Sequence, residues 1–205
     1  MGTDDLYKKR RQNRTRKVGT RATRDRILIV CEGTKTEPNY FEGFRLTNVQ
    51  IVGTGSNTHS VVKRALEEKR RAKRNKERFD QIWCVFDRDS FPSQNFNNAI
   101  AIAKQNDIRV AYSNESFELW YLLHFHYYDS AMTRQQYCDK LSQLLNINYQ
   151  KNAKGIYDLL LQKQQGAIRN AEKLLSKYEI LNPENNNPST TVHLLVRELN
   201  KWLNG

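Results

Sequence analysis

Four short apolar runs in the first part of the chain predict buried β-strands. Each run is followed by a segment whose apolar residues recur at helical spacing. Alternating strands and helices are typical of a parallel sheet with right-handed crossovers, and continuous apolar runs indicate strands that are covered on both faces. The sequence therefore predicts an α/β fold with a mostly parallel sheet of about four strands flanked by helices. The expected strands are residues 27–31, 49–52, 81–86 and 108–112, and the expected helices between them are 36–46, 60–78 and 92–105.

After the fourth strand the pattern becomes helical. A helix is expected to start within residues 113–120 with Asn114 as its N-cap, and Ser189, Thr190 or Thr191 is expected to cap the last helix. The helices expected in this part are 131–147, 155–181 and 189–203. We divide the chain into a flexible basic arm at 1–26, an α/β core at 27–125 and a helical C-terminal region packed on the core at 126–205.

Acidic residues follow the first and third predicted strands. Glu32 comes directly after the first, and Asp87 and Asp89 follow the third. Because the carboxyl ends of parallel strands share one edge of the sheet, we expect the three side chains to meet there. Carboxylates held close together repel one another unless protons or a cation neutralise them, and a hard cation such as Mg²⁺ or Mn²⁺ prefers oxygen ligands. The pattern predicts a metal site of the kind that assists phosphodiester hydrolysis.

Several other residues are candidates for the same site. Glu37 is either a further metal ligand or an acid that complements the helix dipole, and the same two interpretations apply to Glu118, which has a route to the same sheet edge. Lys35, Lys151 and Lys154 could contact a phosphate or lie in solvent. The small turn at 53–55, Gly-Thr-Gly, could bring backbone N–H groups close to a phosphate.

The net charge of +12 is concentrated in two segments. Residues 1–26 contribute +7 and residues 63–78 contribute +6, so the remainder of the chain sums to −1. Basic charge beside an acidic pocket is typical of a protein that holds a nucleic-acid backbone, although a solvated helix face and a disordered tail would have the same composition. The basic residues predicted to bind nucleic acid in the second segment are Lys63, Arg64, Arg70, Arg71, Lys73 and Arg74.

Other features narrow the class of protein. No apolar run approaches the ~20 residues of a membrane-spanning helix, and the N-terminus does not resemble a signal peptide, so we expect a cytoplasmic protein without a membrane partner. Cys31, Cys84 and Cys138 have no zinc-ligand spacing, and we interpret them as reduced thiols.

Four segments resemble one family of proteins. They read ILIVCEGTKTEPNYF at 27–41, WCVFDRD at 83–89, SNESFELWYLLHF at 113–125 and NPSTTVHLLVREL at 187–199. The chain resembles the RloB-like proteins of bacterial and archaeal defence loci, and the order of strand-Glu-Gly and strand-Asp-x-Asp is similar to the Toprim domain of topoisomerases, primases and nucleases.

The resemblance implies a Toprim nuclease that acts in abortive anti-phage immunity, with an AAA-type ATPase as a possible partner. Glu32, Asp87 and Asp89 match the three Toprim acids, whereas Glu37 and Glu118 lie in family motifs without an assigned role. The chain lacks the tyrosine domain of a topoisomerase and the zinc or helicase module of a replicative primase. These departures favour a small nuclease.

Three functional hypotheses follow. The first is a Mg²⁺- or Mn²⁺-dependent endonuclease with catalytic Glu32, Asp87, Asp89 and Glu118, whose substrate is RNA, tRNA included, or DNA. The second is a non-catalytic module that binds nucleic acid or docks an ATPase, with acids that hold a structural ion. The third is a phosphotransfer pocket of the receiver or phosphatase type, which requires a Lys after a late strand where this chain has residues 113–118 instead. Composition does not separate RNA from DNA or indicate the oligomeric state.

Overall fold

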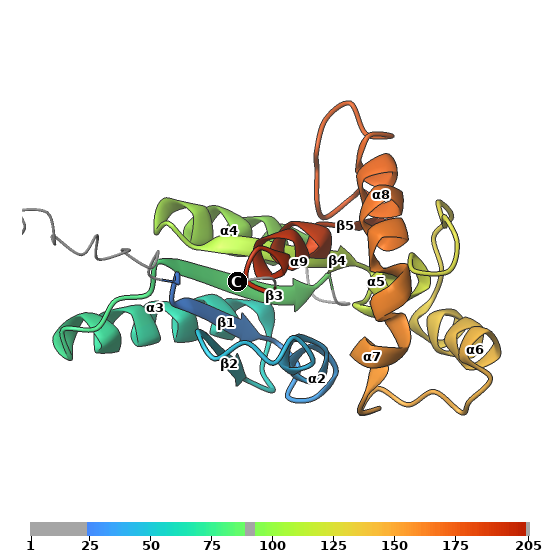
Figure 1. Ribbon diagram of the computed structural model, residues 1–205. Helices are drawn as coiled ribbons and strands as arrows, with labels where there is room; N and C mark the ends of the chain where they lie inside the picture. The colour runs from blue at the N-terminus through green and yellow to red at the C-terminus, as the bar shows by residue number, and fades with distance from the viewer. Residues whose placement is uncertain (1–23, 89–92, 204–205) are drawn as a thin grey trace, which may run out of the picture.

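The computed structural model describes residues 24–88 and 93–203 and contains a five-stranded sheet. The strand order is β2-β1-β3-β4-β5; the first four strands are parallel, and β5 pairs antiparallel with the end of β4. This arrangement confirms the predicted α/β class with its mostly parallel sheet (Figure 1). The strands are β1 (Ile27–Cys31), β2 (Val49–Gly53), β3 (Gln81–Asp87), β4 (Arg109–Asn114) and β5 (Ser189–Thr190).

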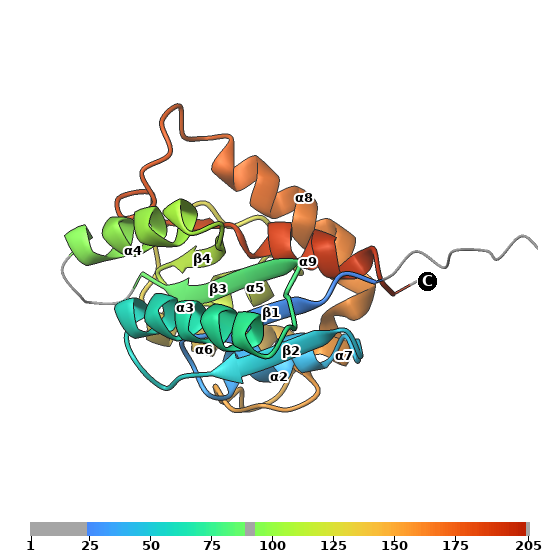
Figure 2. The same ribbon diagram turned by 90° about the vertical axis from the view of Figure 1, so that its left-hand side faces the viewer.

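Helices cover both faces of this sheet. The helices between the parallel strands are α2 (Thr36–Glu42), α3 (Thr58–Arg74) and α4 (Ser93–Gln105). Alternate residues of β1 point to opposite faces, so Leu28 and Val30 pack under α3 and α4, whereas Ile27 and Ile29 pack against α2 and the C-terminal helices. Figure 2 shows α3 and α4 lying side by side over one face. Burial on both faces explains why β1 is apolar at every position.

The C-terminal part of the chain is helical, and it packs in the hydrophobic core on the face of the sheet that α2 covers. Its elements are α5 (Glu118–Leu122), α6 (Arg134–Leu145), α7 (Ile156–Leu160), the 3₁₀ turn η1 (Leu161–Lys163), α8 (Gln164–Leu175) and α9 (Val192–Asn200). Trp120, Tyr137 and Leu195 are fully buried in the same cluster as Ile29 and Val85 of the sheet. Within the described residues, no helix is both long and apolar enough to cross a membrane.

Tertiary pairing takes three of the predicted capping residues, although Thr191, the remaining predicted cap of the last helix, does stand at the N-cap position of α9. Asn114 ends β4 rather than capping a helix, and its side-chain amide donates to the Pro183 carbonyl at 3.0 Å. Ser189 and Thr190 pair with Asn114 and Ser113 as β5, so the last helix begins only at Val192.

The predicted helix at 155–181 is also divided. It consists of α7, η1 and α8, and it ends at Leu175. Ile180 and Leu181, which were expected within it, are 82% and 59% exposed. Extending the helix through them would bury no apolar surface, so packing does not favour it.

Candidate active site

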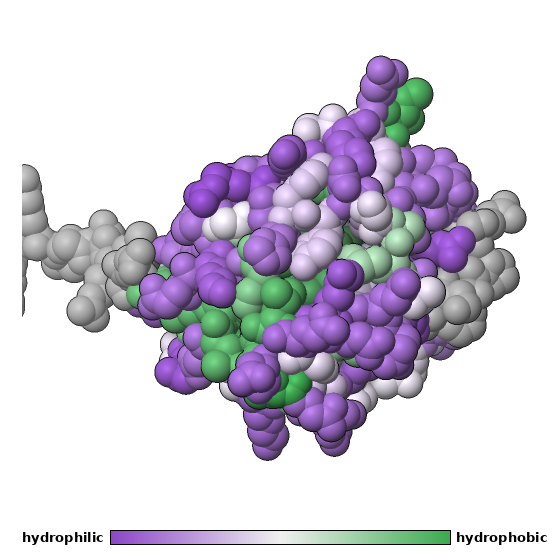
Figure 3. All heavy atoms as spheres, turned by 90° about the vertical axis from the view of Figure 1, so that its right-hand side faces the viewer, coloured by the Kyte–Doolittle hydropathy of each residue, from purple (hydrophilic) through white to green (hydrophobic). Residues whose placement is uncertain are grey.

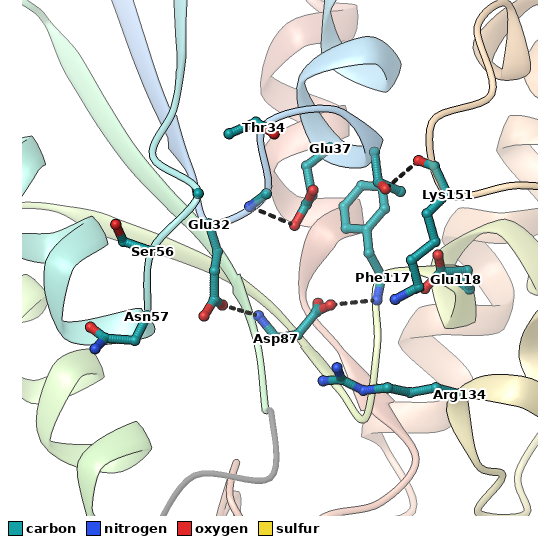
Figure 4. Close-up of a pocket in the computed structure, with 13 residues that line it drawn as sticks. Glu32, Thr34, Glu37, Ser56, Asn57, Asp87, Phe117, Glu118, Arg134 and Lys151 are labelled. Carbon is teal, nitrogen blue, oxygen red and sulfur yellow. Dashed lines mark hydrogen bonds and ion pairs between the residues drawn. The ribbon is translucent and has the colours of Figure 1, made fainter.

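A cleft of about 470 Å³ opens at the carboxyl edge of the sheet and gathers four carboxylates. Glu32 follows β1, Asp87 ends β3, Glu37 lies in the first turn of α2 and Glu118 begins α5. Figure 4 shows their side chains around one space, with Arg134 and Lys151 on the side of Glu118. The lining comprises Glu32, Gly33, Thr34, Thr36, Glu37, Gly55, Ser56, Asn57, Asp87, Phe117, Glu118, Arg134 and Lys151.

Backbone N–H groups position the first two acids. The Asp87 N–H donates to Glu32 Oε2 at 3.1 Å, and the Phe117 N–H donates to Asp87 Oδ2 at 3.0 Å. The first contact exists because β1 and β3 are neighbouring parallel strands that end together. The other oxygen of Asp87, Oδ1, is buried and has no hydrogen-bond partner among the described residues. A buried acceptor of this kind is costly unless something else satisfies it.

Gly33 allows Glu37 to reach the cleft. The Glu37 side chain is 5% exposed, and its Oε1 accepts the Gly33 N–H at 3.3 Å. A Cβ atom at position 33 would lie 2.2 Å from Glu37 Oε2. The Glu-Gly sequence after β1 therefore supplies one acid of the cleft, Glu32, and a glycine, Gly33, that leaves room for a second acid, Glu37.

Glu118 is the most buried acid of the cleft, at 1% exposure. Ser116 Oγ donates to its Oε2 at 2.7 Å, and the Tyr149 hydroxyl donates to its Oε1 at 3.2 Å. Lys151 Nζ lies 3.9 Å from Oε2. Both oxygens are thus held by the protein, which fixes the carboxylate beside the lysine.

Burial and mutual repulsion disfavour the charged forms of Asp87 and Glu37. The pKa of Asp87 is well above its usual range because of desolvation, with smaller contributions from Glu37, Glu118 and Glu32, and the Phe117 N–H opposes the shift. Desolvation also raises the pKa of Glu37, and Lys151 acts against it. A cation placed among these groups would favour their ionised forms.

Two cationic side chains lie across from Asp87. Arg134 begins α6, and its Nε is 3.9 Å from Glu115 Oε1. The backbone of Lys151 is fixed to α2, because its carbonyl accepts the Thr36 hydroxyl, while its side chain remains half exposed. The cleft therefore has carboxylates around it and two cations on the side of Glu118, an arrangement that suits a phosphate held by a metal ion on one side and by cationic side chains on the other.

The family comparison agrees with the resemblance described above. A family model described as RloB-like protein matches residues 27–199. The chain belongs to the RloB-like family. No curated protein and no solved structure matches it. The matched range includes all five strands and every residue that lines the cleft.

The cleft of this RloB-like protein contains some of the predicted site residues and not others. Glu32, Glu37, Asp87, Glu118 and Lys151 line it, and their catalytic, metal and phosphate-binding roles stay predictions. Asp89 lies outside the described residues. Of the other predicted residues, none lines the cleft and all are exposed: Lys35, Lys154 and, on α3, Lys63, Arg64, Arg70, Arg71, Lys73 and Arg74.

Sequence reasoning missed Arg134 and the two residues that donate hydrogen bonds to Glu118, Ser116 and Tyr149. Thr133 and Gln136 form a capping box, which signals a helix start at Arg134 but does not indicate that this start lies at the cleft. The small turn at 53–55 has a structural use, since the N–H groups of Thr54 and Gly55 donate to the carbonyls of Cys31 and Glu32 at 2.9 Å each.

No three His, Cys, Asp or Glu side chains within 24–88 and 93–203 are arranged to hold a metal ion. The donor chemistry nevertheless fits a hard cation. Asp87 Oδ1 is a buried carboxylate oxygen without a partner among those residues, Glu32 lies beside it, and oxygen ligands are the ones that Mg²⁺ prefers.

Proposed function

We propose that this RloB-like protein is a metal-dependent, Toprim-type endonuclease of an anti-phage defence system. It hydrolyses phosphodiester bonds in RNA, tRNA included, or in DNA, under the control of an AAA-type ATPase partner. The observation that carries the proposal is the cleft itself, which gathers four carboxylates and two cationic side chains around one space. The family match supports the place of the chain among RloB-like proteins.

The cation required by this proposal is Mg²⁺ or Mn²⁺. Glu32 and Asp87 would hold it together with Asp89, and Glu37 would be a further ligand. The unpartnered Asp87 Oδ1 is the strongest support, because a cation would satisfy this oxygen and would favour the ionised carboxylate against the burial and the repulsion that raise the pKa of Asp87. When bound, such an ion orients a phosphate and lowers the pKa of an attacking water.

The other residues of the cleft act on the substrate. Arg134 and Lys151 donate charge-assisted hydrogen bonds to the non-bridging oxygens of the scissile phosphate and stabilise the charge that develops there. Glu118 has both oxygens occupied by Ser116 and Tyr149, so it acts as a positioning residue that directs the Lys151 ammonium. This role differs from that of Asp87, whose Oδ1 is available to a ligand.

The test is cleavage of mixed cellular RNA and of plasmid DNA by the purified protein with Mg²⁺, Mn²⁺ or EDTA. We expect Asp87→Asn to lower metal-dependent cleavage at least ~100-fold, because it removes a charge that holds the ion while it keeps the side-chain size. Asp139→Asn is the matched control, since Asp139 is an exposed acid on α6. Undiminished cleavage by Asp87→Asn would overturn the proposal.

A second assay covers a nuclease that is silent without its partner. Wild type, Asp87→Asn and Asp139→Asn are each expressed together with the proposed AAA-type ATPase partner, and the cells are challenged with phage. The proposal predicts protection by the wild type and the Asp139 variant alone. Equal protection by all three would instead support a non-catalytic module whose acids hold a structural ion.

A further inference from the structure

Helix α3 begins at the rim of the cleft and runs away from it. Ser56 and Asn57 line the cleft, and the Asn57 side chain caps the helix by accepting the Ser60 N–H at 3.1 Å. The 17 residues of α3 extend about 25 Å from this point. Val61 and Ala65 bury one side of the helix against the sheet. The opposite side of α3 therefore faces outward along the whole helix, whose position over the sheet is seen in Figure 2.

The outward side of α3 is basic. Lys63, Arg70 and Arg74 form a row along it at helical spacing, interrupted by Glu67, and all four are exposed. We call these three cations the α3 row. Arg71 and Lys73 flank the row and are also exposed.

Few of these charges are neutralised by the protein. Arg64 pairs with Glu68 at 2.8 Å, and Lys69 pairs with Asp107 at 3.8 Å. Within the described part of the chain, the three cations of the α3 row form no ion pair. Like charges four residues apart on a helix repel one another, as Arg70 and Arg74 do, and an anionic partner removes this repulsion.

The composition of α3 indicates which part of a nucleic acid it contacts. The helix contains no Phe, Tyr or Trp, and its one aromatic ring is that of His59 in the first turn, so it lacks the row of large aromatic side chains on which successive unpaired bases stack. Lysine and arginine on a straight helix contact phosphates instead, and the row from Lys63 to Arg74 spans about 16 Å, a length over which a duplex rises by about five base pairs at 3.4 Å each. A duplex presents its phosphates at such regular spacing without exposing its bases.

We propose that the α3 row binds the backbone of a double-helical nucleic acid and leads one strand to the cleft. This inference rests on the proposed function, because the strand on α3 is the one whose phosphodiester reaches Asp87. It adds to that function a substrate class, duplex rather than single-stranded nucleic acid, and a contact that is independent of base sequence.

The test measures binding in EDTA, so that it does not depend on metal-assisted hydrolysis. The probes are a 20-base-pair RNA duplex, the DNA duplex of the same sequence and the separate strands. We expect wild type to bind a duplex more tightly than its strands. The triple variant Lys63→Gln, Arg70→Gln and Arg74→Gln should weaken duplex binding at least ~10-fold and lower the slope of log K against log salt by about 2 to 3.

Two controls separate a phosphate contact from a general charge effect. Lys140→Gln, Arg169→Gln and Lys173→Gln together remove the same charge from α6 and α8, which lie at the other end of the molecule from α3 (Figure 1). This control should retain nearly all duplex affinity. Glu67→Gln, which removes the acid that interrupts the α3 row, should tighten duplex binding several-fold.

Equal losses in the two triple variants would overturn the inference, as would equal affinity of the wild type for duplex and single strands. Failure of the proposed nuclease function gives a different result. In that case cleavage is absent while duplex binding in EDTA still depends on the α3 row.

Discussion

At the scale of single residues, Gly33 has the most direct structural requirement in the cleft. A Cβ there would stand 2.2 Å from Glu37 Oε2, so the Glu37 carboxylate would have to shift and would lose its hydrogen bond from the Gly33 N–H. We expect Gly33→Ala to lower the free energy of unfolding by about 1–3 kcal/mol, as overpacking does elsewhere, and to displace the Glu37 carboxylate from the cleft. Urea unfolding measures the first effect.

Gly166→Ala is the matched control for this substitution. Gly166 lies within α8, and its added Cβ would meet only the end of the Arg169 side chain, at 4.0 Å. Alanine is the better helix former, so this variant should gain about 0.5–1 kcal/mol. If both variants changed the free energy of unfolding in the same direction, the close contact between Gly33 and Glu37 would not determine stability.

At the scale of elements, β5 consists of two residues and depends on side-chain hydrogen bonds. The Thr190 hydroxyl donates to the Tyr112 carbonyl at 2.9 Å and lies 3.0 Å from Ser113 Oγ, and Thr190 is fully buried. Thr190→Val keeps the shape of the side chain and removes these bonds. It should cost about 1–3 kcal/mol in the free energy of unfolding, because buried partners lose their hydrogen bonds.

Thr47→Val provides the comparison for β5. Thr47 is exposed in the turn before β2, so its substitution should change the free energy of unfolding by less than ~0.5 kcal/mol. Similar values for the two threonine variants in urea unfolding would show that the hydroxyl contacts of Thr190 contribute nothing to the stability of this edge.

The same scale shows why some elements could be predicted from the sequence and others could not. β1 and β3 are buried on both faces, and the apolar runs of all four parallel strands coincide with their bounds within one or two residues. The edge rule for parallel sheets likewise located Glu32 and Asp87. Ser189 and Thr190 have a local pattern typical of a helix cap, and only their pairing with Asn114 and Ser113, about 75 residues earlier, makes them a strand.

The basic side of the cleft depends on such distant packing as well. Arg134 and Tyr149 come from segments that follow the α/β core, and nothing in their local sequence indicates that they approach Glu118 or Asp87. Their position follows from the packing of α5 and α6 on one hydrophobic cluster shared with the sheet. The acids were therefore predictable from local pattern and fold class, and Lys151 was among the predicted phosphate contacts, whereas Arg134 required the tertiary structure.

At the scale of the whole molecule, few of the large apolar side chains that the structure describes are exposed. Figure 3 shows a largely polar surface in which apolar residues gather over one limited region and at the tip of one loop. Ile180 and Leu181, in the loop that follows α8, are among the exposed apolar residues. The acidic cleft and the basic α3 lie on other parts of the molecule, so a nucleic acid on α3 would not cover this apolar tip.

The stability of the whole molecule should fall in acid because two histidines are buried as neutral groups. The pKa values of His124 and of His193 are lowered to about 4 each, mainly by desolvation; Lys163 contributes to the first decrease and Arg197 to the second, and backbone hydrogen bonds oppose both. The unfolded chain binds these protons at its ordinary pKa near 6.5, so the stabilisation is complete above that pH and is lost as pH falls from about 6.5 to about 4. Each histidine contributes a slope of at most about 1.4 kcal/mol per pH unit.

Urea unfolding in EDTA between pH 7.5 and pH 5 tests this prediction by comparison of variants. His193→Gln should reduce the decrease in the free energy of unfolding, because one of the two groups no longer titrates. His126→Gln, which alters an exposed histidine, should leave the decrease unchanged. The comparison is needed because Asp87 and Glu37 have raised pKa values, so their protonation favours the folded state in acid and opposes the effect of the histidines. Identical pH profiles for wild type and His193→Gln would mean that His193 does not carry the acid sensitivity.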